Sequence, residues 1–168
     1  MLNRVIAYLV LMVLTVVATL FFQSFRKFKA GLNAFEYYAG GGMSGGHEMI
    51  AIKAGDEGKA HMKFEKAEWH NSEPEVREYI VDSEILAEIQ EVFYRYRMIS
   101  WEKLRRSSME VLDADTHSFS FSFGPDHTHF STNQNLPMRS GTAIGEIFDI
   151  ITEYKENAEK STPLVSEN

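Results

Sequence analysis

Cysteine is absent from this 168-residue chain, and its absence excludes several kinds of chemistry. A chain without thiols forms no disulfide, assembles no iron–sulfur cluster, binds no zinc through cysteine and uses no thiolate nucleophile. Aromatic side chains are plentiful instead, with 12 Phe, 7 Tyr and 2 Trp. This content argues against an intrinsically disordered chain, because such chains carry few residues that build a core.

Positive charge is scarce over most of the chain. Arg4, Arg26, Lys27 and Lys29 precede residue 30, which leaves 13 of the 17 Lys and Arg against all 24 Asp and Glu, a formal balance of −11. A domain this acidic repels nucleic acid and anionic lipid unless its few bases are clustered. We therefore expect no nucleic-acid partner.

Residues 5–22 contain no charged side chain at all. A helix of about 20 residues matches the roughly 30 Å hydrocarbon core of a membrane. Aromatic residues near its two ends, Tyr8 and Phe25 among them, are typical of membrane interfaces. The sequence thus predicts a single-pass anchor with its basic flank in residues 1–29. A cleaved secretory signal is the competing interpretation, but the apolar run continues to Phe22 beyond the small residues around Ala18.

Two features of the sequence point to opposite orientations of this anchor. More bases stand after the segment, at residues 26, 27 and 29, than before it, which places the following domain in the cytoplasm. Short N-terminal anchors, however, commonly lead their domain across the membrane. We favour the extracytoplasmic side, with both orientations open at this point.

Residues 30–156 predict one soluble domain with an α+β fold. Strands are expected where apolar and polar residues alternate or turns intervene, at 33–39, 48–54, 59–67, 75–82, 117–123 and 127–132. Helices are expected where apolar residues recur every three or four residues, at 85–96 and 144–154. This order predicts an antiparallel sheet of about 5–7 strands with two helices packed on one face. The polar residues 157–168 are expected to form a disordered tail.

Alternating Phe and Ser residues from 118 to 123 indicate a half-buried strand that pairs with the strand after the next turn. One register keeps the phenylalanines on a common face, whereas a slip of one residue would set them opposite histidines. The expected pairs are Phe119 with Phe130, Phe121 with Thr128, Ser120 with His129, and Ser122 with His127.

A loop with five glycines in residues 40–46 follows the first expected strand. Residues 42–46 match the Gly-x-Ser-x-Gly pattern of a nucleophile elbow, but that elbow needs a following helix and a large parallel sheet. Here a strand follows and the domain is short, so we assign no catalytic residue. We expect a flexible hairpin loop that contacts a protein or peptide partner. The predicted contact residues are Gly41, Gly42, Met43, Ser44 and Gly45.

His127 and His129 stand two residues apart on one expected strand, so their side chains share a face. Two imidazoles can chelate one metal ion, but a zinc site needs a third or fourth ligand, which has to come from elsewhere in the chain. We expect a solvated pair opposite two serines, and no cofactor. A zinc-dependent sensor or enzyme that uses His127 and His129 is the alternative.

Two further features allow both a functional and a structural interpretation. The bases clustered in residues 95–106 could dock on anionic lipid, or could complement a helix dipole and balance nearby acids. Their members are Arg95, Arg97, Lys103, Arg105 and Arg106. Trp69 stands beside a polar turn, where it would be a recognition feature if exposed. We favour the structural interpretation for both, with Trp69 in the core.

The run Leu32–Tyr38 leading into Gly41-Gly42-Met43, the Phe/Ser strand, and Asn135-Leu136-Pro137 resemble a group of small, uncharacterised, single-pass bacterial proteins anchored in the membrane. The resemblance spans most of the soluble part and implies a bacterial membrane-anchored domain, without an activity or a ligand. Together with the residues, it predicts a non-catalytic binding or structural module, held in the membrane by residues 5–22.

Overall fold

The structure is a computed structural model that describes residues 12–13, 15, 30–40, 45–69, 72–104, 116–132 and 135–161. The chain divides into two compact units, Met1–Gly31 and Leu32–Asn168. In the first unit, residues 12, 13 and 15 are helical. Among the described residues, no helix is both long and apolar enough to cross a membrane. Most of the segment 5–22 lies outside the described residues, so the anchor stays a prediction.

The second unit is built on a six-stranded antiparallel sheet with the strand order β4-β3-β2-β1-β5-β6. The first four strands follow one another as a meander, and the β5–β6 hairpin joins this meander beside β1. The strands are β1 (Ala34–Gly40), β2 (His47–Ala54), β3 (Lys59–Ala67), β4 (Glu75–Asp82), β5 (Thr116–Phe123) and β6 (Asp126–Ser131). The predicted α+β fold with an antiparallel sheet is therefore confirmed.

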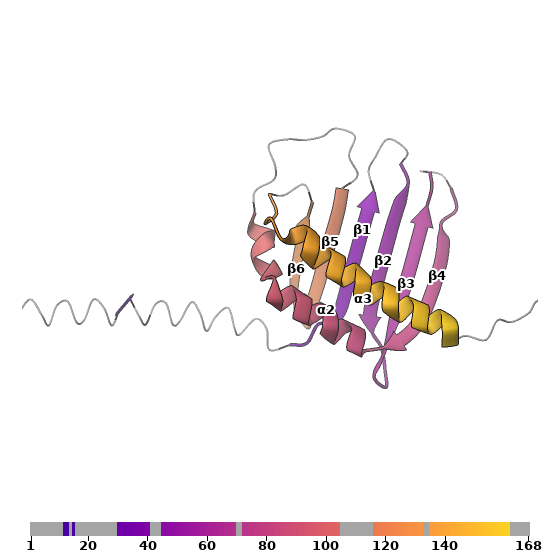
Figure 1. Ribbon diagram of the computed structural model, residues 1–168, viewed down its shortest axis with the longest axis horizontal. Coiled ribbons are helices and arrows are strands. Elements are labelled where there is room, and N and C mark those ends of the chain that lie inside the picture. Colours follow the sequence, from indigo (N-terminus) through magenta and orange to yellow (C-terminus); the bar gives the residue numbers. More distant parts are fainter. Residues whose placement is uncertain are drawn as a thin grey trace, which may run out of the picture. The chain divides into compact units, whose positions relative to one another are not determined.

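Two α-helices lie over the same face of this sheet (Figure 1). The first, α2 (Glu84–Arg95), and the short 3-10 helix η1 (Met98–Lys103) lead the chain from β4 toward the β5–β6 side. The second, α3 (Ser140–Ser161), runs back across the sheet and contacts β4. Because α3 continues to Ser161, residues 157–161 are helical instead of part of a polar tail, and residues 162–168 lie outside the described part.

The face under the helices, here called the covered face, is the apolar one. In β5 the side chains of Phe119, Phe121 and Phe123 are at most 3% exposed, whereas the serines between them are half-buried. The Phe121 ring lies 5.2 Å from the Phe35 ring in β1 and 4.8 Å from the Phe93 ring in α2. Because only one face of the sheet is buried against the helices, apolar and polar residues alternate along β5.

The register of the β5–β6 hairpin is the one predicted from the pattern. Phe119 lies opposite Phe130, Phe121 opposite Thr128, Ser120 opposite His129 and Ser122 opposite His127. The rings of Phe119 and Phe130 stack with their centroids 5.1 Å apart. The cohesion of these aromatic rings on one face therefore determines the pairing of the two strands.

Gly46, just before β2, lies where the backbone at the end of β3 comes close. A Cβ atom added to Gly46 would lie 2.6 Å from the Glu68 carbonyl oxygen and 2.7 Å from the Ala67 carbonyl oxygen. The adjacent pair of His47 and Ala67 belongs to the β2–β3 ladder, so these backbone oxygens have little freedom to move. The base of the glycine-rich loop is thereby held against the end of β3.

We predict that Gly46→Ala destabilises the chain by roughly 1–3 kcal/mol, because the new methyl group has to displace backbone atoms. The measurement is urea unfolding of the full chain, followed by circular dichroism. Gly141→Ala in α3 is the matched control, since its Cβ would meet nothing within 4 Å. That control should be neutral or stabilising by up to about 1 kcal/mol. Equal unfolding midpoints for the two variants would contradict the close approach.

Candidate binding surface

The predicted glycine-rich contact site is only partly described. Residues 41–44 lie outside the described residues, so the proposed contact through Gly41, Gly42, Met43 and Ser44 stays a prediction from the sequence. Gly45 is described and has a φ of 66°, a left-handed conformation that favours glycine. The loop leaves the sheet beside the pair of Gly40 and His47. The contact of this loop with a partner remains a prediction.

His127 and His129 lie on the face opposite the covered one, here called the open face, and both are exposed. Nδ1 of His129 lies 3.1 Å from the hydroxyl oxygen of Ser120, its cross-strand neighbour. In the described part of the chain, no group of three or more His, Cys, Asp or Glu side chains converges as a metal site would require. The two histidines thus offer two ligands, and a zinc site at this pair remains the untested alternative.

The first base of the 95–106 cluster joins the two helices. The Arg95 guanidinium donates a hydrogen bond to the Glu146 carboxylate in α3 at 2.8 Å, and the Tyr96 hydroxyl donates one to the other oxygen of this carboxylate at 2.6 Å. Arg95 thus balances a nearby acid, as the structural interpretation expects. Residues 105 and 106 lie outside the described part.

Trp69 is exposed, with 63% of its surface accessible, so its expected burial in the core is not observed. It sits in the connection between β3 and β4, where the Ser72 hydroxyl donates a hydrogen bond to the Trp69 carbonyl oxygen at 2.9 Å. The Trp69 N–H donates one to the same hydroxyl oxygen at 3.1 Å. These two bonds satisfy the N–H and C=O groups of Trp69, so this residue leaves no main-chain group unpaired while its indole ring faces solvent.

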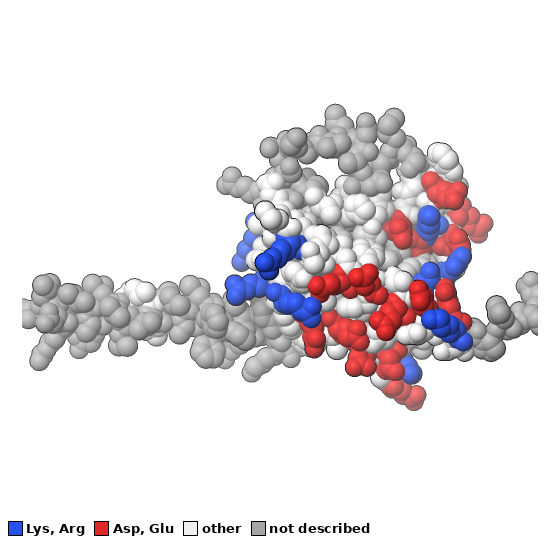
Figure 2. Space-filling view, viewed as in Figure 1, with Lys and Arg blue, Asp and Glu red and all other residues white. Residues whose placement is uncertain are grey.

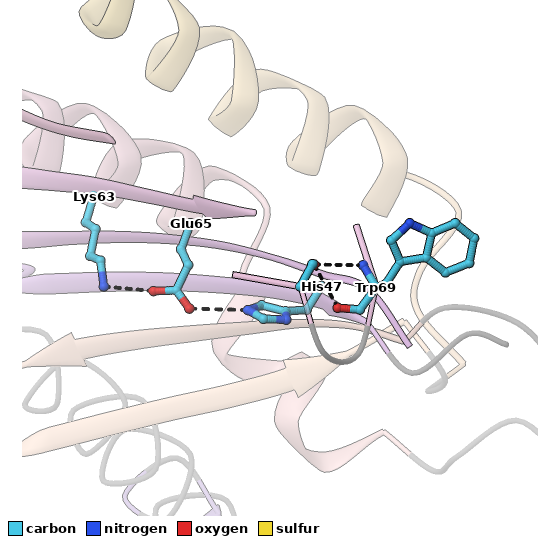
Figure 3. A network of polar contacts seen from close by, with 5 residues as sticks. His47, Lys63, Glu65 and Trp69 are labelled. Atoms are coloured by element: carbon cyan, nitrogen blue, oxygen red, sulfur yellow. Dashed lines mark hydrogen bonds and ion pairs between the residues drawn. The ribbon is translucent and has the colours of Figure 1, made fainter. Parts of the chain in front are cut away.

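A chain of polar contacts crosses the open face close to this connection (Figure 3). The Lys63 ammonium group donates a hydrogen bond to one oxygen of Glu65 at 2.8 Å, and the other oxygen lies 3.2 Å from Nε2 of His47. The His47 ring stacks on Tyr38, with 18° between the ring planes. The sequence did not predict these contacts, because they depend on the register of β2 and β3. In that register Glu65 lies opposite Met49, two residues along β2 from His47.

The hydrogen bond from Lys63 lowers the pKa of the Glu65 carboxyl below its usual value, and the contact with His47 adds to this shift. In turn, the bond to Glu65 raises the pKa of Lys63. A carboxyl with a lowered pKa stabilises the fold above the pKa of the unfolded chain, and this contribution is lost as the pH falls through the folded-state pKa. The Lys63–Glu65 pair is thus an ionic feature of the open face at neutral pH, and the His47 ring lies beside it.

β4 carries apolar side chains on both of its faces. Val76 and Ile80 lie on the open face, where 45% and 66% of their surfaces are accessible. Tyr79 and Val81 lie on the covered face beside α3. This two-sided pattern explains why the alternation of residues 75–82 is imperfect in the sequence. It is the signal by which this strand could have been recognised as unusual.

A groove of about 580 Å³ runs between β4 and the last turns of α3. Five consecutive residues of β4, from Glu78 to Asp82, line one side, so the backbone edge of the strand borders the groove. The α3 side is one helical face with the spacing i, i+3, i+4, i+7. Its residues are Tyr154, Asn157, Ala158 and Ser161.

Acidic side chains outnumber basic ones in the lining of this groove. Glu78 and Asp82 are its acids and Lys59 is its base, with the Lys59 ammonium group 3.5 Å from Asp82. The Tyr154 hydroxyl donates a hydrogen bond to Glu88 in α2 at 2.8 Å, and the Tyr79 hydroxyl donates one to Glu159 in α3 at 2.8 Å. Burial raises the pKa of Tyr154 far above its usual value, and the carboxylate of Glu88 adds to the shift. Figure 2 shows Asp and Glu gathered over the start of α2, Lys and Arg gathered near η1, and both signs interspersed toward β4. Because the two acids of the lining outnumber its one base, the groove favours a ligand with positive charge.

No protein-family model matches the chain, and no curated protein matches it in sequence. The arrangement of its own residues therefore carries the functional argument.

We predict that Lys63→Met raises the pKa of Glu65 toward its usual value, because the main hydrogen bond that stabilises the carboxylate is lost. The measurement is an NMR titration of the side-chain carboxyl carbon in the full chain. Lys53→Met is the matched control, since Lys53 pairs with Glu36 at 3.2 Å elsewhere on the open face. A Glu65 pKa that is unchanged by Lys63→Met, or changed equally by both variants, would refute the assigned pairing.

Proposed function

We propose that this chain is a bacterial, membrane-tethered binding module that performs no catalysis and recognises a protein or peptide. Residues 5–22 would hold it in the membrane as a single-pass anchor, with the α+β domain on the extracytoplasmic side. The uncharged run of these residues and the flanking aromatic residues support the anchor. The glycine-rich loop, Gly41, Gly42, Met43, Ser44 and Gly45, is a proposed contact.

One observation carries the binding role. The outer edge of β4 is bordered by an open groove and by the exposed apolar side chains of Val76 and Ile80. Trp69, in the connection that leads into β4, is exposed as well. Exposed apolar side chains beside an unpaired strand mark sites of association between chains, because burial of this surface and pairing of the strand both favour binding.

We predict that deletion of residues 5–22 moves the chain from the membrane fraction to the soluble fraction. The reason is that these residues carry the apolar surface that partitions into lipid. Carbonate-washed membranes and immunoblotting measure the distribution. A full chain with Thr15→Leu and Thr19→Leu is the control and should stay in the membrane. If the deleted chain also stays there, the proposed anchor is wrong.

The absence of cysteine makes the sidedness directly measurable in the same cells, because a single introduced cysteine is then a unique label. Met138 is fully exposed, so Met138→Cys reports on the domain, and Asn3→Cys reports on the other end of the segment. A membrane-impermeant maleimide should label the first variant from outside and leave the second unlabelled. Labelling of the second alone would place the domain in the cytoplasm.

The zinc alternative is tested by calorimetric titration of zinc into the full chain and into the double variant His127→Ala and His129→Ala. We predict equal and weak affinities, because two imidazoles without a further ligand hold zinc poorly. Ser120→Ala, which changes a neighbour of His129 without removing an imidazole, is the control. Binding by the unsubstituted chain that is tenfold tighter or more would favour a zinc sensor or enzyme instead.

A further inference from the structure

We propose that the groove between β4 and α3 binds an extended, basic segment of another protein, which pairs with β4 as an additional strand of the sheet. This inference rests on the proposed binding function and names its ligand class. Strand addition of this kind draws affinity from main-chain hydrogen bonds and specificity from alternate side chains.

The edge of β4 is open to such pairing. It is the last strand of the sheet on its side in the described part of the chain, and its pairing with β3 is unbroken from Glu75 to Asp82. Proteins usually block exposed edges with charged side chains, a proline or a bulge. β4 contains no proline and its register shows no bulge. Its charged side chains, Glu75, Arg77, Glu78 and Asp82, project from the two faces of the sheet and not along the hydrogen-bonding edge. The outward N–H and C=O groups of alternate residues are thus available to a partner.

The groove provides room for the partner's side chains on the covered side. Its walls are the strand edge from Glu78 to Asp82 and the helical face that includes Asn157, Ala158 and Ser161. Ala158 is small and leaves space, and the Asn157 side-chain amide can donate and accept hydrogen bonds. The Ser161 hydroxyl already donates to the Asn157 carbonyl oxygen at 2.8 Å. A strand that pairs with β4 would direct every second side chain into this space.

The open-face side of β4 defines the chemistry of the ligand. Val76, Glu78 and Ile80 alternate with residues of the covered face, and all three are exposed. A partner strand that complements them carries an apolar, a basic and an apolar residue at alternate positions. The basic residue would face Glu78 from its outer side, since opposite charges stabilise cross-strand pairs. On its inner side Glu78 lies opposite Lys63 of β3, whose ammonium group is hydrogen-bonded to Glu65. The carboxylates around the groove add long-range attraction for the same charge.

Charge also argues against a second copy of this chain as the occupant. Antiparallel pairing of two β4 strands that sets Val76 opposite Ile80 also sets Glu78 opposite Glu78 of the other copy. Like charges directly opposite one another destabilise a strand pair. A basic segment removes this repulsion, so we commit to a different chain as the partner.

The experiment uses a fluorescent probe peptide, Thr-Val-Thr-Lys-Thr-Val-Thr, and the full chain in detergent micelles, with binding measured by fluorescence anisotropy. We expect saturable binding. A peptide with Glu in place of Lys should bind about fivefold to tenfold more weakly, because it meets Glu78 with a like charge.

Two methylated probes test whether the peptide adds as a strand. One carries N-methyl groups on the amides of its Val and Lys residues, and the other on the amides of its Thr residues. Only one of these sets can face β4 in a ladder, since alternate residues turn their N–H groups to opposite sides. We expect one probe to lose binding and the other to retain it. Equal binding of both probes would exclude strand addition.

Protein variants test the location. Glu78→Lys should weaken the binding of the Lys probe and strengthen the binding of the Glu probe. Glu153→Lys makes the same charge change at an exposed position of α3 outside the groove, and it should leave the binding of both probes unchanged. Ala158→Trp should weaken both probes by filling the groove. Circular dichroism melting verifies that each variant is folded.

Absence of saturable binding, or equal effects of Glu78→Lys and Glu153→Lys, would overturn the proposed site. A concentration-dependent dimer that Glu78→Lys alters would also overturn it, because β4 would then be occupied by a second copy. These results leave the anchor standing, since probe binding in micelles does not depend on residues 5–22. Failure of the anchor would be seen in the fractionation and labelling experiments instead.

Discussion

Burial of the phenylalanine side chains of β5 on one face is the constraint on which the rest of the domain depends. Phe121 contacts Phe35 of β1 on one side and Phe130 of β6 on the other, while Phe93 of α2 packs above it. β5 thereby joins the four-stranded meander to the hairpin. Because β5 alternates with serine, only one of its faces can be covered, and the helices have to lie on that side.

This one-sided packing also determines which surfaces stay available. The two helices lie on the covered face, and α3 ends near β4. The open face retains the Lys63–Glu65–His47 contacts. β4 is the strand farthest from β5 in the meander. It therefore lies at the margin of the core, where α3 leaves a groove instead of a tight contact. The proposed binding edge is thus a consequence of where the aromatic core is centred.

Local patterns predicted the elements well because each depends on residues close in sequence. The bounds of β3 follow from alternation and those of β4 from its flanking turns, and the hairpin register follows from avoidance of phenylalanine opposite histidine. The end of α3 was less predictable, since its last turns are polar and their packing beside β4 involves residues about 80 positions apart, such as Tyr79 and Glu159. The exposure of Trp69 likewise depends on how β3 turns into β4.

The sequence alone determined the α+β class, the strand positions, the aromatic face and the uncharged segment 5–22, because composition and short-range periodicity carry these properties. Tertiary structure alone decided that Arg95 binds Glu146, that His47 meets Glu65, and that β4 borders a groove. Such contacts join residues from different strands and helices. They depend on strand order and helix placement, which sequence periodicity does not specify.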